Sequence, residues 1–178
     1  MWCSIPLLKN SSRPIIKELK VHDHQWIQQH KKTIESYYKN AHYFDRDVLD
    51  KIYGNINEVD FVDIIHKITI NICRLLNIKY SFIYASELAL TSSNDKLLYE
   101  ITKKVNGSEY LSGPNGRNYI DKKLFKDITL TYHEFDFPQY QQVNGEFIPW
   151  MSIVDQLFNV GLSKTKEYIF SRPVLKDN

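Results

Sequence analysis

Apolar residues recur at steps of three and four in four parts of the chain, which is the spacing of amphipathic helices. Three of these stripes begin beside residues that commonly cap helices, namely Asp23, Ser92 and Ser152. The second stripe also has apolar groups off its main face, so we expect neighbours to cover it on two sides. The predicted helices run from 23 to about 40, over 61–76, from 92 to 107 and from 152 to 161, with a short helix before Gly54 and further turns over 163–170.

Alternation of apolar and polar residues predicts a strand over 128–133, with His133 on its more polar face. Shorter apolar and β-branched runs predict further strands at 2–5, 14–21, 80–84 and 110–111. Alternating strands and helices favour an α/β fold, with a mixed or largely parallel sheet that is flanked by helices and incomplete at its N-terminal edge. We expect one domain over 1–171 and a frayed tail over 172–178.

The stretch from Gly107 to Phe125 holds three of the six glycines and the tight turn Ser112-Gly113-Pro114-Asn115-Gly116. Backbone N–H groups of such a turn, together with Arg117, could hold an anion. The spacing matches neither a Walker loop nor a dinucleotide-binding motif. An ordinary connection between a strand and a helix is the favoured interpretation, and the anion site is the alternative.

Two further side chains have open roles. His30 lies in the middle of the first apolar stripe, where a hydrogen-bonded core histidine is favoured over a general base or a ligand contact. Asp155 completes the pattern Ser152-x-x-Asp155 at a helix start, which favours a capping carboxylate over a catalytic one.

Composition excludes several classes of protein. The net charge of +2 is too small to argue for nucleic-acid binding, and no apolar run is long enough to predict a membrane span. Neither a metal-ligand cluster, a hydrolase triad nor a Gly-x-Ser-x-Gly motif appears, so we predict no metal, no cofactor and no covalent serine intermediate. Two distant cysteines fit no disulfide framework, which favours a reducing cytoplasm.

The chain resembles the WbqC-like protein family over nearly its whole length. The resemblance rests on several segments: Trp2-Cys3-Ser4-Ile5-Pro6, the helix with Trp26 and His30, Tyr110-Leu111-Ser112-Gly113 with Gly116-Arg117 and Tyr119, Tyr140-Gln141-Gln142, Phe147-x-Pro149, and Ser152-Ile153-Val154-Asp155-Gln156-Leu157-Phe158-Asn159-x-Gly161. This bacterial family often occurs beside genes for O-antigen and other surface polysaccharides, and a glycine-transferring role has been suggested for members. The resemblance therefore implies a cytoplasmic step in modifying a sugar or nucleotide-sugar.

The mechanism expected from this resemblance is acyl or aminoacyl transfer to an amino or hydroxyl group of a sugar. His30 or His133 would be the base, with Asp155 as a third catalytic candidate, and the amides of residues 112–116 with Arg117 would stabilise the oxyanion. The predicted substrate-binding residues are Ser112, Gly113, Gly116, Arg117, Tyr119, Tyr140 and Asn159. A non-catalytic binding or scaffold protein of a polysaccharide-assembly complex is the second hypothesis.

Members of the family usually begin with a further stretch before the segment that matches Trp2. We therefore expect this chain to be a fragment or N-terminally truncated, with an open strand edge at residues 2–5. Such an edge predicts self-association.

Overall fold

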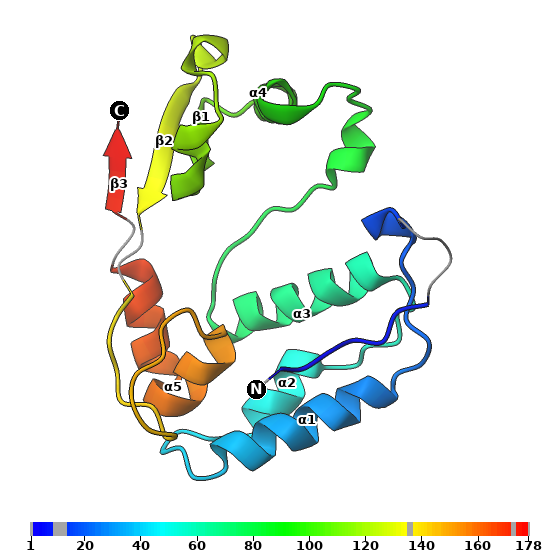
Figure 1. Ribbon diagram of the computed structural model, residues 1–178, viewed down its shortest axis with the longest axis vertical. Coiled ribbons are helices and arrows are strands. Elements are labelled where there is room, and N and C mark those ends of the chain that lie inside the picture. The colour runs from blue at the N-terminus through cyan, green and yellow to red at the C-terminus, as the bar shows by residue number, and fades with distance from the viewer. Residues whose placement is uncertain (1, 9–13, 135–136, 172–173, 178) are drawn as a thin grey trace. The chain divides into compact units, whose positions relative to one another are not determined.

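The computed structural model describes residues 2–8, 14–134, 137–171 and 174–177, and these fall into two compact units (Figure 1). The first unit comprises Met1–Tyr80 and Pro138–Glu167, and the second comprises Ser81–Phe137 and Tyr168–Asn178. Sequence periodicity gave no signal for this division, because the helices and strands on either side of Tyr80 follow the same spacing rules.

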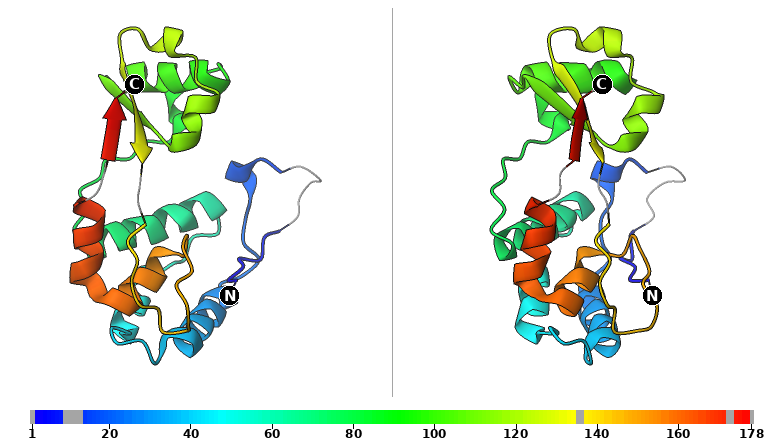
Figure 2. Two further views of the ribbon diagram at one scale, coloured as in Figure 1. Left: turned by 60° about the vertical axis from the view of Figure 1, so that its left-hand side comes forward. Right: turned by 90° about the vertical axis from the view of Figure 1, so that its left-hand side faces the viewer.

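The first unit is mainly helical, and its helices were predicted (Figure 2). Asp45 is the N-cap of the second helix, and its Oδ1 accepts from the Asp47 N–H at 2.8 Å. The first helix has His24 at its N-cap position, and the preceding Asp23 accepts from the Gln25 N–H at 2.8 Å. The core contains the buried Trp26, Leu49 and Phe158, which come from three of these helices. The helices are α1 (Gln25–Tyr38), α2 (Arg46–Tyr53), α3 (Phe61–Leu75) and α5 (Ile153–Phe170).

Helix α3 differs from its prediction in burial. Only Ile64 is fully buried, and Ile65 is 41% exposed. Helix α2 packs against α3, and Asn71 Nδ2 of α3 donates to the carbonyl of Ile52 in α2 at 3.2 Å. Ile64 is one of the apolar groups off the main stripe, so that side of the helix is covered, whereas cover of the main stripe is incomplete at Ile65.

The second unit holds a three-stranded mixed sheet in the order β1-β2-β3. Strands β1 (Glu109–Ser112) and β2 (Thr129–Glu134) pair in parallel, with Ser112 opposite Tyr132. Strand β3 (Val174–Asp177) pairs antiparallel with β2. Helix α4 (Asn94–Lys104) packs its Leu98 and Tyr99 against a core that includes Phe125 and Tyr132. The α/β class and the mixed sheet are thus confirmed.

Three predicted strands do not form. Residues 2–6 and 80–84 have no regular structure, and residues 14–21 contain the 3-10 turn η1 (Ile16–Glu18). Isolated antiparallel bridges join Leu7 to Val21 and Lys20 to Asp60, so pairing there is limited to single bridges. These runs have β-propensity, but a strand also needs a partner, and Pro6 and Pro14 remove backbone donors. The open strand edge on which we based self-association is therefore not formed.

The C-terminal tail also differs from its prediction. We expected residues 172–178 to fray, yet Val174–Asp177 forms β3, with His133 opposite Leu175. Residues 172–173 and 178 lie outside the described part of the chain. Val174–Asp177 supplies hydrogen-bond partners to the N–H and C=O groups of β2 on the side away from β1.

Candidate functional site

The structure divides the predicted site residues between the two units. His30, Tyr140, Asp155 and Asn159 belong to the first unit. The second contains Ser112, Gly113, Gly116, Arg117, Tyr119 and His133. The two groups are therefore considered separately.

Asp155 is the centre of a buried hydrogen-bond network in the first unit. Its side chain is 4% exposed and accepts four hydrogen bonds. Oδ1 accepts from the Tyr38 hydroxyl at 2.8 Å and from Asn159 Nδ2 at 3.1 Å. Oδ2 accepts from the Tyr140 hydroxyl at 2.7 Å and from Gln142 Nε2 at 2.9 Å. Because all four donors are uncharged, the carboxyl group is held by hydrogen bonds and not by an ion pair.

The network changes how Tyr38 ionises. Burial, and secondly the hydrogen bond to Asp155, raise the pKa of the Tyr38 hydroxyl far above its ordinary value. The Tyr140 hydroxyl donates to the same carboxyl group, and its ring lies against Phe147. Tyr140, which we predicted to contact a sugar, therefore has its hydroxyl occupied inside the protein.

Hydrogen bonds to helix α5 also fix the positions of two loops. The Tyr43 N–H donates to the Phe158 carbonyl at 3.1 Å, which fixes the turn after α1. The Val143 N–H donates to Asn159 Oδ1 at 2.8 Å, which fixes the loop before α5. Asn159 Nδ2 in turn donates to the Asp155 carbonyl at 2.7 Å. Both loops are thus positioned by the first two turns of α5.

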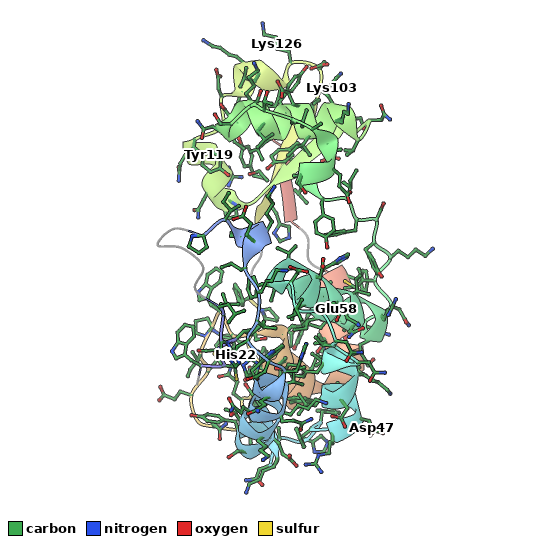
Figure 3. All side chains as sticks on the ribbon, turned by 90° about the vertical axis from the view of Figure 1, so that its right-hand side faces the viewer. His22, Asp47, Glu58, Lys103, Tyr119 and Lys126 are labelled. Atoms are coloured by element: carbon green, nitrogen blue, oxygen red, sulfur yellow. The ribbon has the colours of Figure 1, made fainter. Side chains whose placement is uncertain are left out.

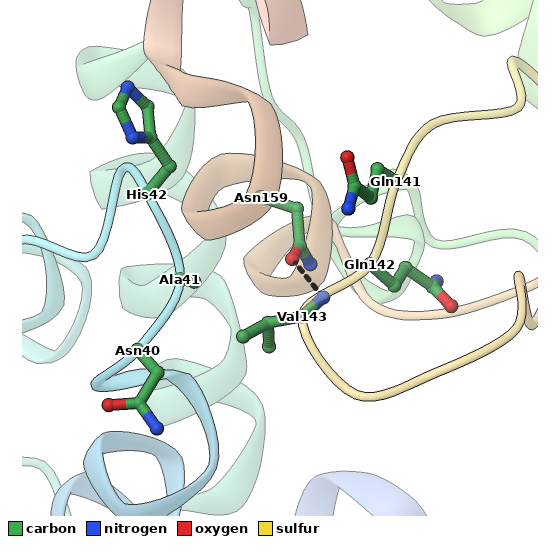
Figure 4. Close-up of a pocket in the computed structure, with 7 residues that line it drawn as sticks. All are labelled: Asn40, Ala41, His42, Gln141, Gln142, Val143 and Asn159. Atoms are coloured by element: carbon green, nitrogen blue, oxygen red, sulfur yellow. Dashed lines mark hydrogen bonds between the residues drawn. The ribbon is translucent and has the colours of Figure 1, made fainter.

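A pocket of about 290 Å³ lies between the two loops (Figure 4). Figure 4 shows the turn after α1 on one side, the loop before α5 on the other, and Asn159 between them. Amide and imidazole side chains dominate the lining, and the lining residues found in the described part of the chain include no aspartate, glutamate, lysine or arginine. The lining residues are Asn40, Ala41, His42, Gln141, Gln142, Val143 and Asn159.

His30 lies outside this pocket, in the core of the first unit. Its Nε2 is 3.0 Å from the Ser4 carbonyl and its Nδ1 is 3.2 Å from the Tyr53 hydroxyl. A carbonyl can only accept, so Nε2 carries a proton and donates to Ser4, while the Tyr53 hydroxyl is the partner of Nδ1. Trp26 packs edge-on against the imidazole at 4.9 Å between ring centroids. This is the geometry of a hydrogen-bonded core histidine, the interpretation favoured by sequence.

In the second unit, the glycine-rich turn packs closely on β1. Ser112 is buried, and a Cβ on Gly116 would collide with its Oγ. Residues Pro114–Asn118 form the 3-10 helix η3, and the Gly116 N–H donates to the Gly113 carbonyl at 3.0 Å. Position 116 therefore requires glycine, because the backbone passes too close to Ser112 for a side chain to fit. An ordinary connection between a strand and a helix can have the same requirement. Anion binding by this turn stays a prediction.

The other predicted residues of the second unit lie on its sheet or at its surface. The Arg117 guanidinium lies over the Tyr132 ring, 4.7 Å from the centroid, a cation–π contact. Tyr119 is 60% exposed and projects from the surface (Figure 3). His133 is half-buried in β2. Substrate contact by these residues stays a prediction.

The model of the WbqC-like protein family matches residues 1–167. The chain belongs to the WbqC-like protein family. This confirms the resemblance inferred from the sequence motifs, and the match covers the first unit and residues Ser81–Phe137 of the second. The WbqC-like chain is also similar to the uncharacterized protein Rv1507c of Mycobacterium tuberculosis, with 27% identity over 166 residues, 90% of this chain and 72% of that protein. No solved structure matches it.

Most of the residues that line the pocket of this WbqC-like protein were not among the site residues predicted from the sequence. Asn40 and His42 stand in a stretch where the helical period breaks, and Gln141 and Gln142 appeared only as part of a family motif. A cluster of uncharged polar residues directly after a helix is the signal that could have drawn attention to them. No helix in the described part of the chain combines the length and hydropathy needed to cross a bilayer.

Proposed function

We propose that this WbqC-like protein binds a sugar or nucleotide-sugar in the cytoplasm during the synthesis of a bacterial surface polysaccharide such as O-antigen. We propose further that it transfers an acyl or aminoacyl group of the glycine type to that sugar. The observation that carries the sugar-binding proposal is the pocket lined by Asn40, His42, Gln141 and Asn159.

The chemistry of the pocket suits an uncharged, hydroxyl-rich ligand. Amide side chains both donate and accept hydrogen bonds, so those of Asn40 and Gln141 can satisfy hydroxyl groups, which also do both, while the amides of Gln142 and Asn159 hold the pocket together. Fixed walls favour binding because little conformational entropy is lost when the ligand enters. The bonds from α5 to Tyr43 and Val143 supply that rigidity.

A transfer reaction in this pocket would need a base, and His42 is its one imidazole among the described residues. The sugar's amino nitrogen attacks the carbonyl carbon of an activated acyl ester. The nitrogen–carbon bond forms, the carbon–oxygen ester bond breaks, the amine proton passes to the His42 imidazole, and the leaving oxygen then takes up that proton. His133, Arg117 and Tyr119 of the second unit stay candidate residues for the same reaction.

A non-catalytic binding role is the second candidate, and a specific observation favours it. His30 has hydrogen-bond partners at both ring nitrogens, and Asp155 accepts four hydrogen bonds. Two of the three predicted catalytic side chains are therefore occupied by the protein itself. Sugar recognition without chemistry, as part of a polysaccharide-assembly complex, would require neither of them.

The test is binding and turnover with the same purified protein. We would titrate sugars and nucleotide-sugars by calorimetry against wild type, His42→Ala and the control His22→Ala, a surface histidine paired with Asp23. Binding should fall in His42→Ala and stay unchanged in His22→Ala. Mass gain on the sugar with activated acyl donors would support the transferase, and binding without mass gain would support the second candidate. Equal binding by all three proteins would remove the pocket from the proposal.

A further inference from the structure

A short segment of the second unit carries three lysines within five residues. Lys122 and Lys123 belong to the 3-10 helix η4 (Lys122–Phe125), and Lys126 follows at its C-cap. All three lysines are exposed, whereas Phe125 is buried in the core of the unit and anchors the segment. Because a 3-10 helix has three residues per turn, Lys123 and Lys126 project from the same side of it.

Helix α4 holds this segment at both ends and adds a fourth lysine. The N–H of Asp121, the N-cap of η4, donates to a carboxylate in the first turn of α4 at 3.0 Å. At the other end, Asp127 accepts from the Tyr99 hydroxyl at 3.0 Å and from Lys103 Nζ at 2.7 Å. Figure 3 shows Lys103 and Lys126 at the same end of the second unit. The four lysines therefore lie on one fixed surface.

The positive charge of this surface is only partly compensated. Asp127 forms an ion pair with Lys103, and Asp121 Oδ1 accepts from the backbone N–H of Lys123. Within the described ranges of the chain, no carboxylate forms an ion pair with the three lysines of the η4 segment. Four lysines against two aspartates leave an excess of positive charge, which attracts an anionic partner.

An apolar side chain stands among these lysines. Leu124 is 37% exposed, although it follows directly on two charged residues. Such a combination suits the boundary between the headgroups and the acyl chains of a membrane. The leucine can enter the apolar layer while the flexible lysines place their ammonium groups among the headgroups. The lysine patch is defined here as Lys103, Lys122, Lys123, Leu124 and Lys126.

The residue types of the lysine patch distinguish between anionic partners. Specific phosphate contacts on nucleic acids favour arginine, which binds with two parallel hydrogen bonds, and single strands also stack on exposed aromatic rings. The lysine patch contains no arginine, and Phe125, the one aromatic residue of the stretch 121–127, is buried. Lysine is a flexible point charge, which suits a fluid surface of anionic headgroups without fixed geometry.

We propose that the lysine patch binds the anionic surface of a membrane and holds the protein there peripherally and reversibly. Each lysine beside such a surface contributes about fivefold to binding, so the three lysines without ion pairs contribute about 100-fold together. One exposed leucine adds too little apolar area for permanent insertion. The inference does not depend on the sugar pocket, whose residues belong to the first unit.

Sedimentation with lipid vesicles tests this proposal on the full chain. One set of vesicles is phosphatidylcholine alone, and the other is an equimolar mixture of phosphatidylcholine and phosphatidylglycerol. The protein should bind the anionic vesicles and not the neutral ones. Binding should fall steeply between about 0.1 M and about 1 M NaCl, because the Debye length shortens from about 10 Å to about 3 Å.

Two matched variants separate the patch from the overall charge. Each removes three positive charges and takes the net charge from +2 to −1. The patch variant should lose about 100-fold in affinity for anionic vesicles, and the control, altered at exposed lysines of the first unit, should bind nearly as wild type does. Both should keep the wild-type melting temperature, because the altered side chains are exposed. The patch variant is Lys122→Gln, Lys123→Gln and Lys126→Gln, and the control is Lys17→Gln, Lys32→Gln and Lys39→Gln.

The apolar part of the patch has its own variant. Leu124→Ser should weaken binding to anionic vesicles less than the patch variant does, and it should keep the salt dependence, because all the charges remain.

Several outcomes would overturn the proposal. Equal affinity of the patch variant and wild type for anionic vesicles would do so, as would equal losses in the patch variant and the control. Wild-type protein that stays in solution with anionic vesicles at low salt would do so as well. Tighter binding of duplex DNA or of an acidic polysaccharide than of anionic vesicles, at the same salt, would assign the patch to another class of polyanion.

Discussion

Gly161 divides α5 into two helical segments and offers a sharp test of the packing around the pocket. Its φ of 81° and ψ of 167° lie in a region that essentially glycine alone adopts. A Cβ at this position would lie 2.7 Å from Tyr43 Cδ1 and 3.1 Å from two further atoms of that ring. Tyr43 belongs to the turn that forms one wall of the pocket, so Gly161→Ala should affect both stability and binding.

The expected magnitude has two parts. Backbone strain contributes about 1 to 3 kcal/mol. The overlap with the Tyr43 ring contributes about another 1 to 3 kcal/mol if the ring cannot move away. Gly161→Ala should therefore lower the free energy of unfolding by about 2 to 6 kcal/mol.

Two other glycines provide matched controls. Gly145 has a φ of +102° and open space around its Cα, so Gly145→Ala should show the strain without the overlap, about 1 to 3 kcal/mol. Gly113 has an ordinary φ of −67° and open space, so Gly113→Ala should be neutral or slightly stabilising. Compared with Tyr43→Ala alone, the double variant Gly161→Ala with Tyr43→Ala should lose only the free energy that corresponds to the backbone strain.

Urea unfolding followed by Trp26 fluorescence reports on the core of the first unit, because Trp26 is buried there. If Gly161→Ala and Gly145→Ala lower the free energy of unfolding equally, the half-exposed Tyr43 ring has moved aside. Ligand affinity should then change, because this movement alters one wall of the pocket. If Gly161→Ala is as stable as Gly113→Ala, the conformation assigned to Gly161 is wrong.

Three further predictions concern the buried polar groups. Asp155→Ala should lower the free energy of unfolding by about 3 to 5 kcal/mol, because it leaves several buried donors, among them Tyr38 and Gln142, without an acceptor. A loss below about 1 kcal/mol in urea unfolding would contradict this prediction. Burial raises the pKa of Tyr38 and of Tyr53, so the folded state keeps protons that the unfolded state releases above about pH 10. Stability should therefore fall as the pH rises through that value, less steeply in Tyr38→Phe, and smooth titration of all twelve tyrosines in the folded protein would argue against it. His30→Ala should cost about 1 to 3 kcal/mol while ligand affinity is retained, and a stable variant with lost turnover would restore the catalytic role.

The helices were predictable because their signals are local. Apolar spacing identified α1, α3, α4 and α5, and the Ser152-x-x-Asp155 pattern located the start of α5 at Ile153. Strand β2 was predictable for the same reason, since alternation shows one covered face. The runs at 2–5 and 80–84 have equal β-propensity, but strand formation depends on a partner that no local pattern reveals.

The Asp155 network shows where sequence reasoning ends. Tyr38 and Asp155 are 117 positions apart, and their hydrogen bond forms only when α1 and α5 pack together. The capping pattern located this helix start, where Ser152 Oγ accepts from the Val154 N–H at 3.3 Å, but the Asp155 carboxyl group accepts from four side chains instead of acting as the helix-start carboxylate that we favoured. It could not show that Tyr38, Tyr140, Gln142 and Asn159 all donate to its carboxyl group. Nor could it place His42 in a pocket, because that depends on where the turn after α1 meets α5.

The first two turns of α5 act as the frame of the proposed site, and this has a consequence for mutagenesis. Asp155 and Asn159 are four residues apart, so they lie on the same face of the helix, and each holds a different part of the pocket. A change in the frame should therefore lower stability and ligand affinity together. His42 contributes to the lining from an exposed position, so its removal should lower affinity with little change in stability. Comparing the two effects in each variant separates residues that contact the ligand from residues that position the pocket.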